Sequence, residues 1–208
     1  MQKPIILVGG GGHCKSVIEA IESSGRKILG VLDLPEFIGK KILNYEVIGS
    51  DLDLAKYVNY AEFIVTIGFI KNPKPRIKQH EYIVANGGKL AIVIASTAQV
   101  SKYANIAEGT VVLHNASVNA GAKIGKGVII NTAANIEHDV EVGDYVHIST
   151  GAMINGDCKI NNNTFIGSLA VLANGISVAK NCIIGAGSIV INDITESGTY
   201  VGCPVRKL

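Results

Sequence analysis

The sequence predicts an α/β plus β protein, in which a small parallel α/β unit precedes a parallel β-solenoid that fills the second half of the chain. Three observations predict this architecture. Strand-like and helix-like segments alternate before residue 95. Four consecutive glycines, Gly9–Gly12, separate the first strand from the first helix. From Ile94 onward, a branched aliphatic residue recurs at every sixth position.

The six-residue spacing runs without a break and matches neither the helical period of 3.6 nor the strand period of 2. Glycine or asparagine often follows the aliphatic residue, as at Gly125 and Asn131, and both tolerate the left-handed backbone of a tight corner. Three hexads then make one triangular coil, with the aliphatic residues stacked in columns at about 4.8 Å. The repeated positions are Ile94, Val100, Ile106, Val112, Val118, Ile124, Ile130, Ile136, Val142, Ile148, Ile154, Ile160, Ile166, Leu172, Val178, Ile184 and Val190.

The pattern of the N-terminal part predicts alternating strands and helices. Strands are predicted at residues 5–8, 27–33 and 60–68, and a fourth at 89–95 runs into the solenoid. The first helix follows the glycines, carries Val17, Ile18 and Ile21 on one face and stops at Gly25; a second covers 76–88. We place the domain boundary near Ala95, which gives domains 1–95 and 96–208.

Composition excludes several classes of protein. The formal net charge is only +2, from 19 basic and 17 acidic residues, so no partner nucleic acid is expected. The four cysteines are widely spaced and contain no CxxC pair, which favours a reducing, cytoplasmic location over a disulfide scaffold. The apolar run near the N-terminus is too short for a signal peptide or a membrane span, so no membrane insertion is expected.

The glycine turn "GGGGHCK" (9–15) is a candidate binding site. Glycines let a ligand approach the backbone, and the following helix N-terminus favours an anion such as a pyrophosphate. Asp33 ends the next strand, where dinucleotide folds bind a ribose. Cys14 replaces the last glycine of the G-x-G-x-x-G fingerprint, so we interpret the turn as half a site, suited to one nucleoside diphosphate. The alternative is a turn that only packs against the sheet.

Several motifs together resemble one known family: "GGGGHCK", "VLD", "VTIG", "NTAANIEHDVEVGDYVHIS", "FIGSLA", "IIGAGSIV" and "YVGCPVRKL". The chain resembles the hexapeptide-repeat sugar O- and N-acyltransferases, in the branch that acts on nucleotide-linked amino sugars or sialic acids. The resemblance implies a Rossmann-like N-terminal domain and a left-handed parallel β-helix built of hexapeptide repeats. It also implies a homotrimer, with acetyl-CoA as donor lying between neighbouring β-helices.

The resemblance assigns roles to residues of the β-helix. His138 is similar to the family's general base, and Asp139 to the carboxylate that raises its basicity. On chemical grounds the adjacent Glu137 could also hold the ring in one tautomer. His147 is similar to the histidine beside the thioester, and Gly156 to the glycine whose N–H faces the thioester oxygen. Two further positions, Ser168 and Ala186, fall where the pantetheine and nucleotide of the cofactor contact backbone.

In the N-terminal domain, Gly11, Gly12 and His13 are similar to the nucleotide-sugar turn, and Asp33 to the uracil or ribose contact. Two positions depart from the family pattern. Leu34 and Gly68 are also predicted substrate-binding positions, but Leu34 stands where many relatives have a second Asp, and Gly68 is followed by "FIKNPKPR", which displaces Asn72 and Arg76. These departures leave the base and the sugar open.

The predicted activity is acetyl-CoA-dependent N-acetylation of a nucleotide-linked amino sugar, such as a UDP- or dTDP-4-amino-4,6-dideoxy sugar, for surface glycan synthesis. A neutral imidazole can act as the general base in this reaction, because an ammonium must lose a proton before its nitrogen attacks a thioester. Three alternatives stay open. They are a sialic-acid-type O-acetyltransferase, a non-catalytic nucleotide-sugar binder, and a zinc enzyme of the γ carbonic anhydrase type using His114, His138 and His147. We expect no metal.

Overall fold

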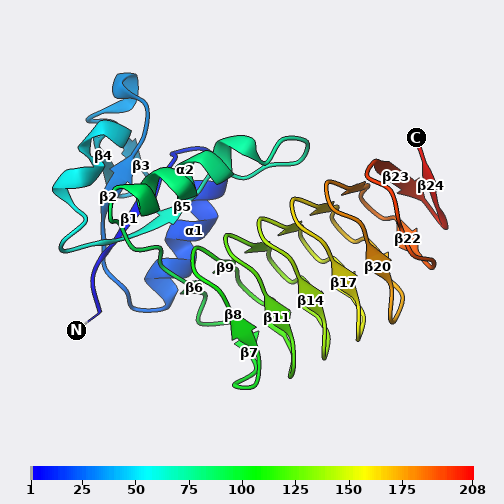
Figure 1. Ribbon diagram of the computed structural model, residues 1–208. Coiled ribbons are helices and arrows are strands. Elements are labelled where there is room, and N and C mark those ends of the chain that lie inside the picture. The colour runs from blue at the N-terminus through cyan, green and yellow to red at the C-terminus, as the bar shows by residue number, and fades with distance from the viewer. Residues whose placement is uncertain (1) are drawn as a thin grey trace.

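A computed structural model describes residues 2–208 and confirms the predicted fold class (Figure 1). The N-terminal unit is a twisted sheet in the order β3-β4-β2-β1-β5, parallel except for β3. Its inner strands are runs of buried aliphatic residues, as expected for a sheet covered on both faces. The strands are β1 (Ile5–Val8), β2 (Ile28–Leu32), β3 (Lys41–Ile42), β4 (Tyr45–Gly49) and β5 (Glu62–Val65).

Two α-helices of the described chain cover this sheet. Helix α1 (Gly12–Ser23) buries Val17, Ile18 and Ile21, the face predicted from the sequence, and ends just before Gly25. Helix α2 (Lys74–Ala85) starts two residues before the predicted segment, because Pro75 fits the first turn of a helix. The hairpin β3–β4 and the 3₁₀ helices η1 (Pro35–Phe37) and η2 (Asp51–Lys56) were not predicted.

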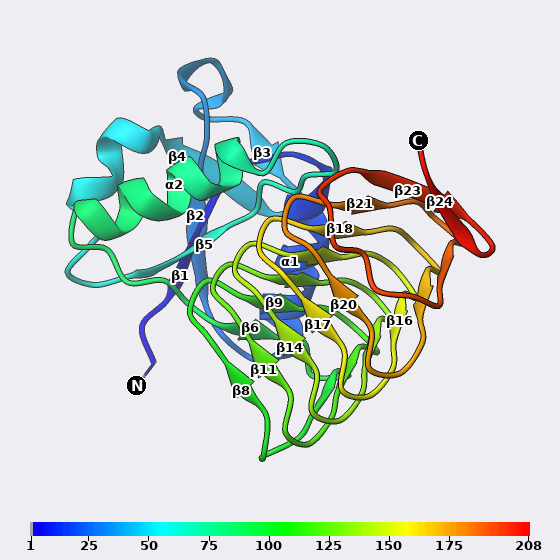
Figure 2. The same cartoon turned by 45° about the vertical axis from the view of Figure 1, so that its right-hand side comes forward.

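The second part is a parallel β-helix whose strands form three sheets over residues 93–208 (Figures 1 and 2). We call these sheets the docked face, which the N-terminal unit covers, the neutral face and the charged face. The docked face contains β6 (Val93–Ile94), β9 (Val111–Val112), β12 (Ile129–Ile130), β15 (His147–Ile148), β18 (Phe165–Ile166), β21 (Ile183–Ile184), β23 (Thr199–Gly202) and β24 (Val205–Lys207).

The neutral face contains β7 (Gln99–Val100), β10 (Ser117–Val118), β13 (Asn135–Ile136), β16 (Met153–Ile154), β19 (Val171–Leu172) and β22 (Ile189–Val190). The charged face contains β8 (Asn105–Ile106), β11 (Lys123–Ile124), β14 (Glu141–Val142), β17 (Lys159–Ile160) and β20 (Ser177–Val178). Each strand pairs with the strand 18 residues away, for example Val118 with Ile136. The chain therefore passes the docked, neutral and charged faces in turn.

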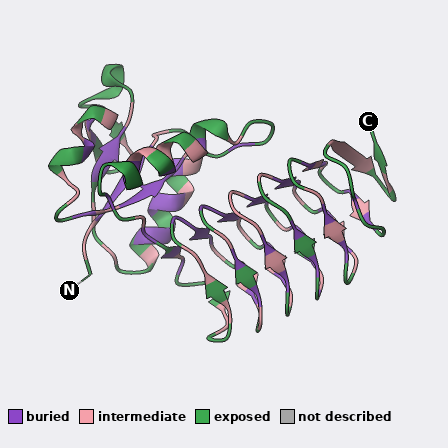
Figure 3. Ribbon diagram, viewed as in Figure 1, coloured by how far each residue is buried: buried purple, intermediate pink, exposed green. Residues whose placement is uncertain are grey.

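The predicted aliphatic columns form the core of the β-helix, and most of their members are buried. Figure 3 shows the inner positions buried, while green or pink segments lie on the outside. One detail of the prediction was wrong. From Gly109 to Gly187, the left-handed residue of each corner is the third after the aliphatic residue, as at Asp139 and Tyr145, and not the first. Gly125 is required for a different reason, since a β-carbon there would lie 2.7 Å from the carbonyl carbon of Gly143 in the next coil.

The segment predicted as a fourth strand belongs to the β-helix. Strand β6 pairs with β9, and only Leu90 bridges to Phe63 of the N-terminal sheet. A shared apolar cluster joins the two parts, with Val17 and Ile21 of α1 in the same cluster as Val111. The unpredicted hairpin β23–β24 covers the last coil. Among residues 2–208, no helix has the length and apolar character needed to cross a membrane.

Candidate functional site

The glycine turn between β1 and α1 opens into a pocket of about 550 Å³. Gly10 has no room for a side chain, because a β-carbon would collide with Asp33 and Ile42. Gly11 and Gly12 instead face open space, because a β-carbon added at either residue would meet no atom within 4 Å. The pocket is lined by Val8, Gly9, Gly10, Gly11, Gly12, His13, Leu32, Asp33, Leu34, Asp51, Thr66, Ile67, Gly68 and Gln79.

Asp33 shapes this turn through its carboxylate. One oxygen accepts a hydrogen bond from the N–H of Gly10 at 2.9 Å, and the other accepts one from the N–H of Leu34 at 2.8 Å. Leu34 itself is exposed. A second lobe of about 350 Å³ shares Gly10, Gly11 and Asp33 with the first, and extends towards Phe37, Lys40, Lys41 and Ile42. The hairpin β3–β4 builds this lobe, so sequence analysis missed it.

His13 and His147 meet where the pocket approaches the docked face. Their ring centroids lie 6.4 Å apart, and Gly68 lies against the His13 side chain. Burial lowers the pKa of His13 to about 3 and that of His147 to about 4. Both rings are therefore neutral at pH 7. The nearby Cys14 is also buried, which raises the pKa of its thiol to about 11 and makes it unreactive.

The tautomer of His147 follows from its contacts. Its Nδ1–H donates to the carbonyl oxygen of Phe69 at 2.7 Å, and its Nε2 lies 3.4 Å from the side-chain nitrogen of Asn131. Phe165 packs edge-on against the same ring. The predicted cofactor residue His147 is thus a buried part of the contact between the two domains. Its placement beside a thioester stays a prediction.

His138 lies on the corner between the neutral and charged faces, which we call the neutral–charged edge. Its Nδ1 is 3.0 Å from Oδ2 of Asp139, and both side chains are exposed. Asp139 adopts a left-handed backbone, with φ of 60°, which turns its carboxylate back to the preceding ring. If Nδ1–H donates to this carboxylate, Nε2 carries the free lone pair. Gly156, one coil further, lies directly against the ring.

Glu137 has a different environment from Asp139. The side-chain amides of Asn119 and Asn135 donate to its two carboxylate oxygens, each at 2.8 Å. These hydrogen bonds hold the pKa of Glu137 below its usual value, and the bond from Asn135 has the largest effect. No hydrogen bond joins Glu137 to the His138 ring within residues 2–208. The 18-residue spacing of Asn119 and Glu137 was the signal that could have revealed this pair from the sequence.

The other predicted cofactor residues lie elsewhere in the chain. Ser168 follows β18 and Ala186 follows β21, on the corner between the docked and neutral faces, the docked–neutral edge. The Ser168 hydroxyl lies 2.9 Å from that of Ser149, and Ala186 is exposed. The neutral face separates this edge from the one that carries His138 and Gly156. A single chain therefore brings Gly156 to the His138 ring but leaves Ser168 and Ala186 on a different edge.

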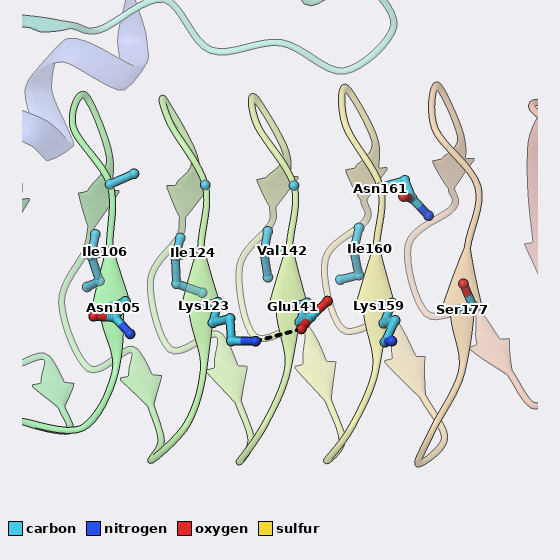
Figure 4. Close-up of a pocket in the computed structure, with 13 residues that line it drawn as sticks. Asn105, Ile106, Lys123, Ile124, Glu141, Val142, Lys159, Ile160, Asn161 and Ser177 are labelled. Carbon is cyan, nitrogen blue, oxygen red and sulfur yellow. Dashed lines mark hydrogen bonds and ion pairs between the residues drawn. The ribbon is translucent and has the colours of Figure 1, made fainter.

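A groove of about 770 Å³ runs along the charged face (Figure 4). Figure 4 shows Asn105, Lys123, Glu141, Lys159 and Ser177 aligned on successive strands. Lys123 and Glu141 form an exposed ion pair at 2.9 Å. Ion pairs between exposed side chains add little to the stability of the fold. The groove lies away from the glycine turn and holds none of the predicted site residues.

The zinc alternative finds no support in this arrangement. His114 follows β9 on the docked–neutral edge and its Nδ1 bonds the hydroxyl of Thr97 at 2.8 Å, whereas His138 lies on another edge. Over residues 2–208, His, Cys, Asp and Glu side chains nowhere gather in groups of three that could hold a metal ion.

Comparison with known proteins now decides the family. The family model of the PglD N-terminal domain matches residues 4–83, and that of the bacterial transferase hexapeptide (six repeats) matches residues 157–192. The acetyltransferase domain of PglB from Neisseria gonorrhoeae is 31% identical, with full coverage of both chains and a TM-score of 0.91. The chain belongs to the hexapeptide-repeat sugar N-acetyltransferase family.

Other solved structures extend the comparison. The PglB domain has also been solved in complex with acetyl coenzyme A. PerB from Caulobacter crescentus, solved with CoA and GDP-perosamine, is 27% identical over 100% of this chain and 98% of its own, with a TM-score of 0.91. WeeI from Acinetobacter baumannii, at 24% identity and a TM-score of 0.88 with full coverage of both chains, shares the fold. No protein with curated annotation matches the sequence.

Proposed function

We propose that this hexapeptide-repeat N-acetyltransferase transfers the acetyl group of acetyl-CoA to the amine of a nucleotide-linked amino sugar. The observation that carries the proposal is His138, held by Asp139 at 3.0 Å and packed on Gly156, in a chain that also presents an open glycine turn. The PglB relative binds acetyl coenzyme A, and the PerB relative binds CoA and GDP-perosamine. We place the reaction in the cytoplasm, where the four free cysteines would stay reduced.

The two lobes of the glycine-turn pocket suggest how the acceptor lies. The N-terminus of α1, with Gly11 and Gly12 open, suits the diphosphate. The sugar then points past His13 and Gly68 towards the β-helix. The nucleoside extends the other way, past Asp33 into the lobe with Phe37 and Lys41, where an aromatic ring and a cation can contact a base.

The proposed chemistry uses the residues of the neutral–charged edge. Nε2 of His138 takes a proton as the acceptor amine attacks the thioester carbonyl carbon, and Asp139 stabilises the imidazolium. The N–H of Gly156 makes no hydrogen bond within residues 2–208 and can donate to the oxyanion. When the tetrahedral intermediate collapses, the C–S bond breaks and His138 returns the proton to the CoA sulfur. A general base of this kind contributes about 10²–10⁴-fold.

A homotrimer completes the site in this proposal. The glycine-turn pocket lies beside the docked face. His138 lies on the neutral–charged edge, which is the corner of the β-helix opposite the docked face. Only a neighbouring copy can bring its His138 to this chain's pocket. The neutral face suits such a contact, because its strands carry no charged outward residue and leave Met153 exposed. Its outward positions are Gln99, Ser117, Asn135, Met153, Val171 and Ile189.

Thiol release from acetyl-CoA, measured across UDP-, dTDP- and GDP-linked 4-amino sugars, tests the proposal. We expect turnover with at least one nucleotide amino sugar and none with the matching 4-hydroxy sugar. Transfer to the hydroxyl sugar, or to a free sialic acid, would favour the O-acetyltransferase alternative. Binding of nucleotide sugars without any thiol release would identify a non-catalytic binder.

A further inference from the structure

Within residues 2–208, Arg76 is a fully buried cation without a carboxylate partner. It lies in the first turn of α2 with no exposed surface. Burial lowers the pKa of its guanidinium to about 9, so it still carries its charge at pH 7. Each of its hydrogen bonds goes to a backbone carbonyl oxygen. A buried charge must be hydrogen-bonded or it costs several kcal/mol, so these carbonyls determine where the guanidinium lies.

Two of these carbonyls lie at or beside the wall of the acceptor pocket. Nη1 of Arg76 donates to the carbonyls of Val65 at 2.6 Å and Ile67 at 3.1 Å, at the carboxyl end of β5. Ile67 lines the glycine-turn pocket and lies against Gly9. Thr66, between them, donates its hydroxyl to the carbonyls of Val8 and Gly9. The guanidinium thus lies directly behind the glycine turn.

The other two carbonyls belong to the β-helix. Nε donates to Gly127 at 3.0 Å, and Nη2 reaches Gly109 at 3.4 Å. These glycines are left-handed corner residues of adjacent coils, with φ of 73° for Gly109 and 61° for Gly127. One helical turn after Arg76, His80 packs against both glycines and edge-on against Tyr145 of the next coil. One face of α2 is therefore seated on a column of β-helix corners.

We infer that Arg76 is a positioning residue that fixes the acceptor pocket at one orientation on the β-helix. This inference rests on the proposed function, because orientation matters only if the pocket must present an amine to a thioester held between β-helices. The planar guanidinium fork bonds the two domains at once, which an ammonium cannot do with the same geometry. A rotation of the N-terminal domain would leave a buried cation with unpaired donors. Misplacing a reacting group by about 1 Å can cost about 10²-fold in rate.

The test compares Arg76→Met and Arg76→Lys with Arg26→Met as the matched control. Arg26 is also a largely buried arginine, but it bonds only Glu62 and the Lys3 carbonyl, both within the N-terminal domain. We expect kcat to fall at least 10-fold in both Arg76 variants. Dissociation constants for CoA and for the nucleoside diphosphate, measured separately, should stay within about 2-fold. Arg26→Met should keep the wild-type kcat.

Gly109→Asn is a second variant that leaves Arg76 in place. Asn occupies the same left-handed corner position at Asn163 and Asn181, so the β-helix tolerates it. At Gly109, however, a β-carbon collides with the His80 ring and must push α2 away. We expect the same loss of kcat with the same unchanged binding constants. This variant decides the question if Arg76→Met fails to fold.

Hydrogen exchange gives a readout that does not depend on activity. Peptides from α2 and from the corners at 107–128 should exchange faster in Arg76→Met and Gly109→Asn, while those of 147–190 stay unchanged. If the variants show these changes in hydrogen exchange but the wild type transfers no acetyl group, the proposed function is wrong and the contact between the domains is still supported. Wild-type kcat in folded Arg76→Met, or a nucleotide dissociation constant that rises as much as kcat falls, overturns the positioning role. So does an equal loss in Arg26→Met.

Discussion

The ring of His138 lies against the backbone of Gly156, one coil further along the β-helix. A β-carbon on Gly156 would be 2.6 Å from Cε1 and 2.7 Å from Nε2 of that ring. The absence of a side chain at residue 156 therefore sets both the position of the imidazole and its distance from a backbone N–H. The base and the oxyanion donor proposed for acetyl transfer are thus adjacent in space although 18 residues separate them in sequence.

Gly156→Ala should displace the His138 ring without unfolding the β-helix. Gly156 does not have a left-handed backbone, so alanine fits its backbone angles, while the new methyl group occupies the place of the ring. We expect kcat to fall roughly 10- to 10²-fold, because the base moves away from the amine. Steady-state kinetics and the melting temperature check this. A variant with wild-type kcat would show that the contact has no catalytic role.

His138→Ala should fold and assemble normally, since the side chain is exposed. Its kcat should fall about 10²-fold or more, the usual size of a general-base effect, while acetyl-CoA affinity changes little. Asp139→Asn should cost less than His138→Ala, because the imidazole stays in place and loses only the carboxylate that orients it. Retention of kcat within a few-fold in His138→Ala would place the base elsewhere.

Gly11→Val should impair acceptor binding selectively. Its β-carbon position meets no atom within 4 Å and points into the space that we assign to the diphosphate. We expect a KM for the nucleotide sugar at least 10-fold higher and a KM for acetyl-CoA that is nearly unchanged. Initial rates with each substrate varied in turn provide the measurement. Equal damage to both constants would indicate that the turn is only structural.

The trimer should depend on the neutral face. Sedimentation equilibrium should give three times the 21.8 kDa chain mass. Met153→Lys places a charge on the neutral face and should dissociate the trimer and abolish activity together. Lys159→Met, on the adjacent charged face, is the matched control and should leave assembly and kcat unchanged. A fully active monomer would contradict the shared site.

Acid should weaken the contact between the domains. Burial lowers the pKa values of His13 and His80 to about 3 and of His147 to about 4, below the value of about 6.5 in an unfolded chain. The unfolded state then binds more protons, so stability is complete above about pH 6.5 and falls as the pH drops towards about 4 for His147 and about 3 for His13 and His80, with a slope of up to about 1.4 kcal/mol per pH unit for each histidine. His80→Phe keeps the ring packing on Tyr145 and should reduce this slope in denaturant unfolding. An unchanged slope would show that His80 does not titrate on unfolding.

The architecture could be predicted because it follows from local periodicity. An aliphatic residue at each sixth position can be buried only if the chain turns a corner between repeats, so the columns that include Val118, Ile136 and Ile154 define the coil. The glycine turn before α1 could also be predicted from the sequence, because the strand, the glycines and the helix follow one another directly along the chain. The pairing of His138 with Asp139 joins sequence neighbours, and the structure preserves it.

Other parts of the site depend on contacts between distant residues. The burial of His147 by Phe69, the lobe built by Phe37 and Lys41, and the bonds of Arg76 to both domains join segments that no short motif relates. By itself the sequence determined the β-helix, the α/β unit and the candidate base, because each depends on neighbours or on an 18-residue repeat. Only the tertiary structure decided which edge each residue occupies and how the two domains meet, because these depend on how the domains pack.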